Sequence, residues 1–424
     1  MEGLQKTDSM PSTRFSVQKL AYVLICLCIV LSVLYICSAF FVPLTFGILF
    51  AFMLKPLCDK VEHVFGNRVL AILITLLLVG FFIGGVFTFF FIRVSAVVSE
   101  ADNIVQNLQD ATVEVLNQCG AWFGLSARET SRYFDERFLN AVTEPFSILT
   151  SGLSASGYVI GNFLLAILYT FFFLLYRSAF RNFLIGQFRD SAQAEGEHTI
   201  KEVQHVASDY LSGMVTVMLV LGVLNSLGLW AIGIQYPLVW GFLGALLAVI
   251  PYVGTTLGGL LPLLYAIATT ATFWQPAAVI ILYSTIQFVE GNLITPKIVG
   301  NSVKINALAA VISLIFGAAF WGLAGLVLAI PILAMVRIIM DHIKPLKPIA
   351  LLLSDDLYDH SDTFLTEYHK PEYRITSLFN KKDYILTQPW LTSTLKPANT
   401  VSQPDAEVIP DTKTEKGDSD TGGE

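Results

Sequence analysis

The sequence predicts an all-α polytopic membrane protein with about eight transmembrane helices and with broken or re-entrant segments in its C-terminal half. Of its 424 residues, 54% are hydrophobic and only 14% are charged, whereas a soluble domain has about 25% charged residues. The apolar residues form blocks long enough to cross a bilayer, which takes about 20 residues per helix. In the C-terminal half a polar block, residues 287–300 (QFVEGNLITPKIVG), separates the apolar runs 276–289 and 307–320.

Composition and charge divide the chain into seven segments. We expect a cytoplasmic N-terminus (1–19), three membrane spans (20–92), an extracytoplasmic amphipathic helical insert (93–150), a fourth span (151–176), a cytoplasmic helix (177–207), a C-terminal membrane half with broken helices (208–343) and a cytoplasmic tail (344–424). From about residue 386 the tail lacks the apolar residues needed to form a core, so we expect it to be disordered. The orientation follows from lysine and arginine residues, which concentrate in the predicted cytoplasmic segments.

The first apolar run is long enough for two helices. Pro43 and Gly47 predict a turn within it, so that the arms 20–38 and 41–55 form a hairpin. The third span, residues 69–92, follows after a loop that contains lysine and arginine.

Residues 93–150 show a helical period instead of a continuous apolar run. Val97, Ile104 and Leu108 belong to an apolar series at helical spacing, and acidic residues such as Asp102 lie on the other face. This pattern is typical of an amphipathic helix. The segment carries more acids than bases, so we place it outside the cytoplasm, packed against the membrane domain or against neighbouring subunits.

The predicted cytoplasmic helix carries a group of potential metal ligands. His198, Glu202 and His205 lie on roughly one face of a helix, because they follow each other by four and then three residues. A metalloprotease helix, however, needs two histidines four residues apart with a glutamate next to the first. The pattern fails that test, so we interpret the segment as a solvated charged helix and expect no metal site.

Glycine and proline interrupt the apolar sequence that follows the fifth span, Tyr210–Gly233. Their density predicts kinked or discontinuous helices. Two more passes follow, at 253–271 and 276–290. Residues 306–340 are long for one span, and Trp321–Gly322 near their middle is compatible with one tilted helix or with a half-span followed by a full one.

Eight spans with both ends in the cytoplasm leave one conflict. Lys297 and Lys304 would fall in an outer loop, against the positive-inside rule. If residues 276–321 instead form a re-entrant or broken-helix arrangement, both lysines lie in a polar cavity. We prefer this second arrangement.

The polar block 287–300 is the strongest candidate for a functional site. A charged side chain at bilayer depth costs about 2.5–3.5 kcal/mol, and proline there leaves backbone groups unpaired. We therefore expect a broken helix that lines a cavity. Glu290 is the best candidate for a titrating group, and the alternative is that Glu290 and Lys297 only neutralise each other. Lys297 could hold an electron-rich substrate oxygen or extend to the membrane interface.

Motifs for several other functions are missing from the sequence. It has no Walker A loop for ATP, no HExxH helix and no GxSxG elbow, and no aspartate lies between residues 210 and 340 to serve in peptide hydrolysis. The net charge of −7 and the lack of a basic cluster argue against binding of nucleic acid. We therefore expect neither an enzyme nor a bound cofactor.

Three stretches resemble the AI-2E family of bacterial and archaeal inner-membrane proteins, which are often described as autoinducer-2 exporters or permeases. They are YLSG (210–213), AVIPYVGTTLGGLLPLLYAI (248–267) and VEGNLITPKIVGNSVKINALAAVISLIFGAAFWGLAGLVLAIPIL (289–333). The resemblance covers about residues 15–345. One departure is Ala307, which follows Asn306 where many members have proline.

The resemblance implies a protein of about eight spans that assembles as a homo-oligomer, for which a pentamer is one form. Its implied function is secondary, ATP-independent export of a small polar metabolite or of a signalling molecule of the autoinducer-2 type, as in quorum sensing. Cation–proton (Na⁺/H⁺) antiport is the alternative. A membrane scaffold that transports nothing is a third hypothesis.

The resemblance and the polar block together give two sets of candidate residues. The expected substrate or ion pathway consists of Glu290, Asn292, Thr295, Lys297 and Asn306. The expected helix breaks or gates are Pro251, Gly254, Gly258, Pro262, Pro296, Gly300, Gly322, Gly325 and Pro331. Secondary transporters commonly place their binding site on interrupted helices near the middle of the membrane.

Overall fold

The computed structural model describes most of the predicted membrane domain. The described residues are 17–100, 103–110, 113–114, 156–188, 192–249, 253–270, 272–298 and 303–357, with Tyr368 and Tyr373. The chain divides into two units, Met1–Phe379 and Asn380–Glu424, and all described residues belong to the first. Most of the predicted insert, the predicted breaks at Pro251 and Gly300, and the predicted disordered tail lie outside the described residues.

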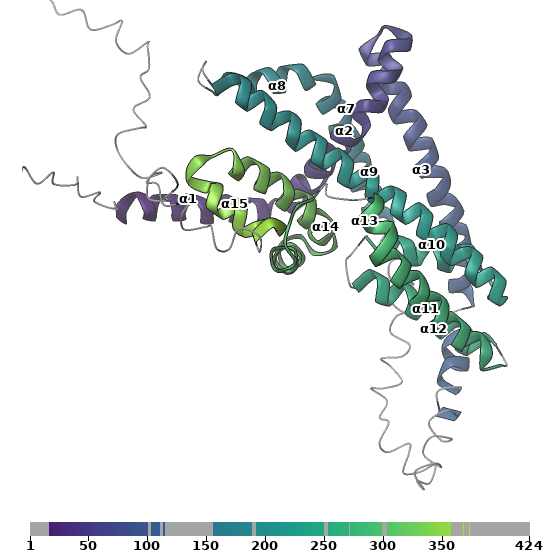
Figure 1. Cartoon of the computed structure of the whole chain (residues 1–424). Coiled ribbons are helices and arrows are strands. Elements are labelled where there is room, and N and C mark those ends of the chain that lie inside the picture. Colours follow the sequence, from purple (N-terminus) through teal and green to yellow (C-terminus); the bar gives the residue numbers. More distant parts are fainter. Residues whose placement is uncertain are drawn as a thin grey trace, which may run out of the picture. The chain divides into compact units, whose positions relative to one another are not determined.

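Helices form the described part of the chain, which contains no β-strand (Figure 1). Five of them are long and apolar enough to cross a membrane: α2 (Ser38–Phe65), α3 (Arg68–Ser99), α9 (Gln193–Ile232), α12 with its continuation (Trp274–Ile298) and α14 (Ala307–Asp341). A sixth candidate is the pair α7 (Ser156–Leu175) and α8 (Arg177–Gly186), which is bent by 66°. Three shorter apolar helices are α1 (Val17–Ile36), α10 (Pro237–Leu247) and α11 (Val253–Thr269). The protein is therefore an all-α polytopic membrane protein.

The predicted turn at Pro43 and Gly47 is wrong. Both residues lie inside α2 and are buried, and the chain breaks earlier, at Cys37. Gly47 is needed for packing, because a Cβ atom there would lie 2.6 Å from the Cβ atom of Tyr169 on α7. Pro43 removes one backbone hydrogen bond of α2. The close packing of α2 against α7 offsets the loss of that bond.

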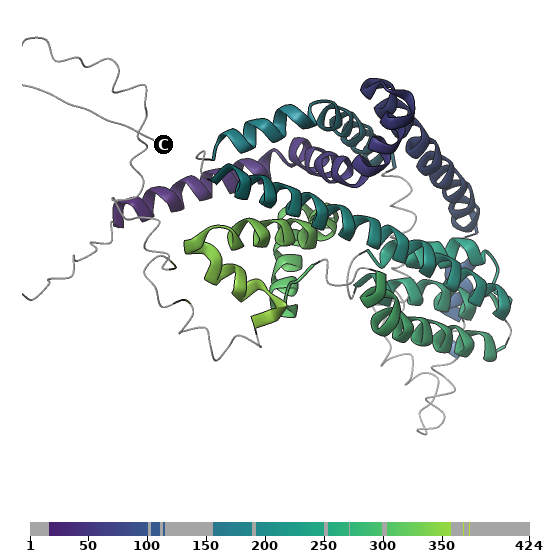
Figure 2. The same cartoon turned by 45° about the horizontal axis from the view of Figure 1, so that its top comes forward.

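The helix α9 joins two segments that the sequence analysis separates. Its polar first part and its apolar second part form one continuous helix of 40 residues. The break lies before it, between the end of α8 and Gln193. Along its length α9 packs against α2, α10, α12 and α14, and Figures 1 and 2 show α14 along its first part and α10 to α13 along its second.

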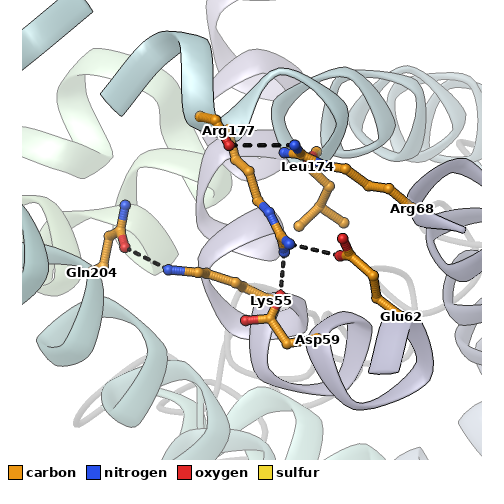
Figure 3. A network of polar contacts seen from close by, with 8 residues as sticks. Lys55, Asp59, Glu62, Arg68, Leu174, Arg177 and Gln204 are labelled. Carbon is orange, nitrogen blue, oxygen red and sulfur yellow. Dashed lines mark hydrogen bonds and ion pairs between the residues drawn. The ribbon is translucent and has the colours of Figure 1, made fainter. Parts of the chain in front are cut away.

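Charged residues gather at one end of the helices, which we call the basic end. Arg177, the first residue of α8, donates hydrogen bonds to the carboxylates of Asp59 and Glu62 on α2, with an Nη2–Oε2 distance of 2.6 Å to Glu62 (Figure 3). Arg68 at the start of α3 donates from Nη2 to the carbonyl oxygen of Leu174 at 2.8 Å. A guanidinium with several fixed acceptors holds its neighbours in a defined geometry.

Lys55 connects this network to α9, because its Nζ atom lies 3.2 Å from Oε1 of Gln204 (Figure 3). The basic end therefore contains the end of α2, the start of α3, the end of α7 and the polar part of α9. The sequence analysis assigns the 55–68 loop and the 177–207 segment to one side of the membrane, and the structure brings the two together.

At the opposite end of the same helices, which we call the far end, polar side chains connect α3, α9 and α11. The Tyr236 hydroxyl donates to Glu100 Oε1 at 3.3 Å, and the Tyr265 hydroxyl donates to Gln235 Oε1 at 3.2 Å. Burial is the main cause of the raised pKa of Tyr236, and the nearby Glu100 carboxylate raises this pKa further. Gln275 at the start of α12 donates to the carbonyl oxygen of Ile232 at 3.4 Å.

These contacts show that α10 and α11 form a hairpin. The start of α10 and the end of α11 both lie at the far end, beside the end of α9. The 11 residues of α10 are about 16 Å long, roughly half of the 30 Å apolar thickness of a bilayer. The hairpin therefore reaches only part of the way through the helices and returns to the end where it began.

Part of the predicted insert covers this hairpin. Ile104 and Leu108 lie in a helical stretch, residues 103–110, and both are buried. They share one apolar cluster with Val97 of α3 and Trp240 of α10. In the described residues, the apolar face predicted from the helical period is thus a packing surface against the membrane helices.

The helix α14 is a second hairpin. Trp321 and Gly322 have non-helical backbone angles, and Gly322 has a φ of 60°, so the predicted bend is confirmed. The two arms then touch, because a Cβ atom on Gly325 would lie 1.9 Å from the carbonyl oxygen of Gly317. The first arm, residues 307–320, is about 21 Å long and too short to span the apolar layer.

The two hairpins resolve the charge conflict at Lys297 and Lys304 without a polar cavity. Both lysines are exposed, so the expectation that they lie in a cavity is wrong. Because α11 returns to the far end, α12 runs from the far end toward the basic end and its continuation carries Lys297 there. Lys304 lies just before the start of α14. A re-entrant arrangement is present, but it is formed by α10 and α11 and by α14.

The contact between Gly317 and Gly325 predicts opposite effects of alanine at two glycines. We expect Gly325→Ala to lower stability by about 1–3 kcal/mol, because overpacking forces the arms apart. On α3, a Cβ atom added to Gly85 would have no atom of another helix within 4 Å, so Gly85→Ala should be neutral or stabilising by up to about 1 kcal/mol. Thermal unfolding of detergent-purified variants measures both, and equal shifts would contradict the hairpin.

Candidate functional site

The polar block 287–300 is a π-helical turn inside a continuous helix. The helix α12 (Trp274–Val289) continues through η2 (Glu290–Ile294) into α13 (Thr295–Ile298), and the backbone N–H of Thr295 donates to the carbonyl oxygen of Glu290, five residues back. Pro296 explains the widening, because its ring would clash with the carbonyl group four residues earlier in a regular helix. The predicted broken helix is therefore wrong for the described residues, and a π-turn takes its place. Such turns occur frequently at functional sites.

The later polar residues of this block have different exposures. Asn292 and Lys297 are exposed, as is Pro296, and Thr295 is partly buried. The Asn292 amide donates to the carbonyl oxygen of Phe288 at 2.8 Å and so satisfies a backbone group of the widened turn.

Glu290 and Lys297 do not pair. No ion pair joins them among the described residues. The two residues lie about 10 Å apart along a helix that continues between them. The hypothesis that they act as a neutralised pair is therefore wrong, and Glu290 has to be considered with other neighbours.

Glu290 lies in a recess between α9, α10, α11 and α12. The lining residues are Leu221, Asn225, Gly244, Ala248, Gly258, Tyr283, Ile286, Gln287 and Glu290. The recess has a volume of about 20 Å³, and a cavity needs about 10–15 Å³ by the same measure to hold one water molecule. In this conformation the recess therefore has room for water or an ion and not for a metabolite.

Two uncharged polar atoms in the recess have no hydrogen-bond partner among the described residues. They are Oδ1 of Asn225 and the hydroxyl oxygen of Tyr283, and both are buried. A buried polar group without a partner costs about 1–3 kcal/mol. The partly buried Glu290 carboxylate lines the same recess. A water molecule, a proton or a small cation that enters the recess would satisfy such oxygen atoms.

The recess lies at mid-depth along the helices. Asn225 precedes the end of α9 at Ile232, and Tyr283 follows the start of α12 at Trp274, so both lie about 10–14 Å from the far end. Glu290 lies about 24 Å from the far end by the same rise per residue. In an apolar layer about 30 Å thick, the recess thus extends through the middle.

Glycine contacts hold the α10–α11 hairpin against the recess. A Cβ atom on Gly258 would lie 2.8 Å from the Cα atom of Gly244, and one on Gly254 would lie 1.6 Å from the carbonyl oxygen of Leu247. Because Gly254 and Gly258 have no side chain, the backbones of α10 and α11 can approach each other this closely. Pro262 is buried inside α11.

Comparison with known proteins decides the identity. The family model described as "AI-2E family transporter" matches residues 24–344. The chain belongs to this AI-2E transporter family. The match includes both hairpins, the π-turn and every residue that lines the recess, so the site of this AI-2E transporter lies inside the family's common part.

Individual relatives are transport proteins by their names. The chain is 25% identical to the putative transport protein YueF of Bacillus subtilis strain 168 over 72% of this chain and 84% of YueF. It is 34% identical to the putative transport protein YrrI of the same strain over 36% of this chain and 42% of YrrI. It is 29% identical to the AI-2 transport protein TqsA of Escherichia coli K12 over 38% of this chain and 46% of TqsA. The alignments thus span less than half of YrrI and of TqsA.

The predicted pathway residue Asn306 has a structural position in this AI-2E transporter. Its Oδ1 atom accepts from the N–H of Ala309 at 2.8 Å and so caps the start of α14. Its Nδ2 atom donates to the carbonyl oxygens of Leu352 and Ser354, at 2.7 and 3.1 Å. These bonds join α14 to the end of α15 (Lys347–Leu353) and place Asn306 away from the recess.

The remaining predicted gate residues belong to the α14 hairpin. Gly322 makes its bend, Gly325 makes its arm contact, and Pro331 is buried in its second arm. Of the predicted residues that the structure describes, only Glu290 and Gly258 line the recess.

Asn225 and Tyr283 are not among the residues predicted from the sequence. Asn225 is an amide inside the apolar part of α9, and Tyr283 lies in the apolar run before the polar block. Polar residues inside membrane helices usually face the protein interior, and this signal was sufficient to select Asn225. Tyr283 lies seven residues before Glu290, so helical spacing already places both on one face of α12 and its continuation. Asn225 reaches the recess only through the packing of α9 against α12, which the sequence does not reveal.

The cap at Asn306 predicts a loss of stability without a change in what is transported. Asn306→Ala should lower stability by about 1–2 kcal/mol, because it removes an N-cap and leaves backbone groups unpaired. Thr285→Ala, which removes only a bond to the carbonyl oxygen of Ile281 within one helix, should stay within about 0.5 kcal/mol of the parent protein. Thermal unfolding measures both. An unchanged stability with lost transport would return Asn306 to the pathway.

Proposed function

We propose that this AI-2E transporter is a secondary, ATP-independent transporter in which the recess around Glu290 binds the proton or cation that is coupled to transport. The observation that carries the proposal is that the unpaired Asn225 Oδ1 and Tyr283 hydroxyl line the same recess as the Glu290 carboxylate. Unsatisfied polar atoms inside a membrane protein are costly. They are therefore expected where a ligand satisfies them during the working cycle.

The proposed transported solute is a small polar metabolite or a signalling molecule of the autoinducer-2 type, moved out of the cell. One relative, TqsA, is named as an AI-2 transport protein, and this name is the support for the solute class. Because the recess is below the size of a metabolite site, the α10–α11 hairpin has to move away from Asn225 and Glu290 for such a solute to pass.

Cation–proton antiport is the second candidate, and the small volume of the recess favours it. A carboxylate with an amide and a hydroxyl oxygen is a suitable ligand set for a hard cation such as Na⁺. The same carboxylate can release a proton when the cation binds. In this function no large opening of the hairpin is required.

The proposed membrane topology has six crossings, by α1, α2, α3, α7, α9 and α12–α13, with the α14 hairpin entering from the basic end and the α10–α11 hairpin from the far end. The basic end then faces the cytoplasm of an inner-membrane protein, in agreement with the positive-inside rule. Both chain ends are cytoplasmic in this arrangement. Homo-oligomeric assembly, for example as a pentamer, also remains a proposal.

Transport in proteoliposomes tests the function. A pH-sensitive dye with an imposed Na⁺ gradient reports antiport, and labelled autoinducer-2 reports export. We expect Glu290→Gln to lower the active flux at least about 10-fold and Tyr283→Phe to lower it less, because bonds to a charged group are worth about 1.5–3 kcal/mol and neutral ones about 1.

The matched control is Lys297→Gln, seven residues further along the same helix and exposed. It should leave the flux close to that of the parent protein. If Glu290→Gln and Lys297→Gln both leave every flux unchanged, the recess is not the coupling site. If the parent protein moves neither ions nor solute but captures a specific partner, the scaffold hypothesis replaces transport.

A further inference from the structure

Two histidines and a glutamate meet at the basic end, far from the recess. His198 and Glu202 lie on α9, and His342 follows the last residue of α14. Glu202 Oε2 lies 3.6 Å from Nε2 of His342 and 3.9 Å from Nδ1 of His198. One ligand atom from each residue lies within 4.8 Å of the others.

The fold explains why these residues are together. His198 and Glu202 are four residues apart on one helix and therefore neighbours on its surface. His342 comes from a distant part of the chain, because α14 doubles back at Gly322 and its second arm packs against α9. The third residue of the group is thus supplied by tertiary structure.

The ring of His342 is oriented for binding. Its Nδ1 atom lies 3.0 Å from the carbonyl oxygen of Ile338. Nδ1 must donate there, because a carbonyl oxygen only accepts, so in the neutral ring the lone pair is on Nε2, the atom that faces Glu202. A backbone carbonyl that fixes the tautomer in this way is a common partner of metal-binding histidines.

We propose that His198, Glu202 and His342 bind one divalent transition-metal ion of the Zn²⁺ class, which holds the polar part of α9 to the end of the α14 hairpin. Two imidazoles and one carboxylate suit Zn²⁺ and its neighbours, whereas Mg²⁺ and Ca²⁺ prefer oxygen ligands. A tetrahedral Zn²⁺ with bonds of about 2.0–2.1 Å separates its ligand atoms by about 3.3 Å. His198 is exposed and the other two are partly buried, so small side-chain rotations bring the three atoms to that spacing.

The same helix contains a natural comparison. His205 and Asp209 are also four residues apart, with Nδ1 and Oδ2 separated by 3.2 Å. They form an exposed local pair on α9 and are not part of the three-residue group. If Zn²⁺ bound to any local histidine–acid pair, the loss of His205 and the loss of His198 would weaken binding equally. If the metal site requires His342, only the loss of His198 weakens binding.

Zinc binding by the full-length, tag-free protein in detergent tests the proposal. Competition with a chromogenic chelator gives the affinity and stoichiometry, and Co²⁺ absorption reports the coordination geometry. We expect one ion per chain, and at least about 10-fold weaker binding for His342→Ala and for His198→Ala, since even loss of an outer-shell partner costs 10–100-fold. His205→Ala should bind as the parent protein does.

A second readout separates binding from folding. Zn²⁺ should raise the unfolding temperature of the parent protein and of His205→Ala, because a ligand stabilises the state that binds it, and should not raise that of Glu202→Gln. Size-exclusion chromatography confirms that the variants are intact. Absence of stoichiometric binding, or an equal loss in His205→Ala and His342→Ala, would overturn the proposal.

Discussion

Polar groups inside the apolar layer have to find partners within the protein, and this constraint accounts for the main features of the structure. Backbone groups freed by Pro296 are re-paired by a π-turn, in which Thr295 bonds to Glu290 and the Asn292 amide bonds to the Phe288 carbonyl. The arms of the short hairpins are helical, so most of their backbone groups pair within each arm. Asn225 Oδ1 and the Tyr283 hydroxyl, which line the same recess as Glu290, depart from this rule because they have no partner among the described residues.

Glycine contacts make the two hairpins possible. Gly244 with Gly258, and Gly317 with Gly325, bring backbones to a distance that no side chain would permit. Such contacts give much of their stability through packing instead of specific hydrogen bonds. The α10–α11 hairpin carries Gly244, Ala248 and Gly258 of the recess, so a displacement of this hairpin would change access to Glu290 directly. The proposed metal site would hold the other hairpin, α14, in place.

The fold class and several local features could be predicted from the sequence. The apolar blocks predict a membrane protein, and Trp321–Gly322 predicts the bend in α14. The helical period of Val97, Ile104 and Leu108 predicts a packing face. The prolines did not predict where helices break. Pro43 lies inside the continuous helix α2, and Pro296 follows a π-turn in a helix that continues through it. The site could be predicted only as far as Glu290, because Asn225 comes to the recess, and His342 to Glu202, only through tertiary packing.

The central claim is that the recess around Glu290 opens to water during transport, and cysteine accessibility measures this most directly. In a variant without its five native cysteines, Gln287→Cys introduces a thiol at a residue that lines the recess. Phe288→Cys introduces a thiol at the next residue, which is exposed and does not line the recess. We expect a membrane-impermeant thiol reagent to modify position 287, at a rate that changes with the imposed ion gradient, and to leave position 288 unmodified in lipid. Equal inertness of both positions under every gradient would contradict the account.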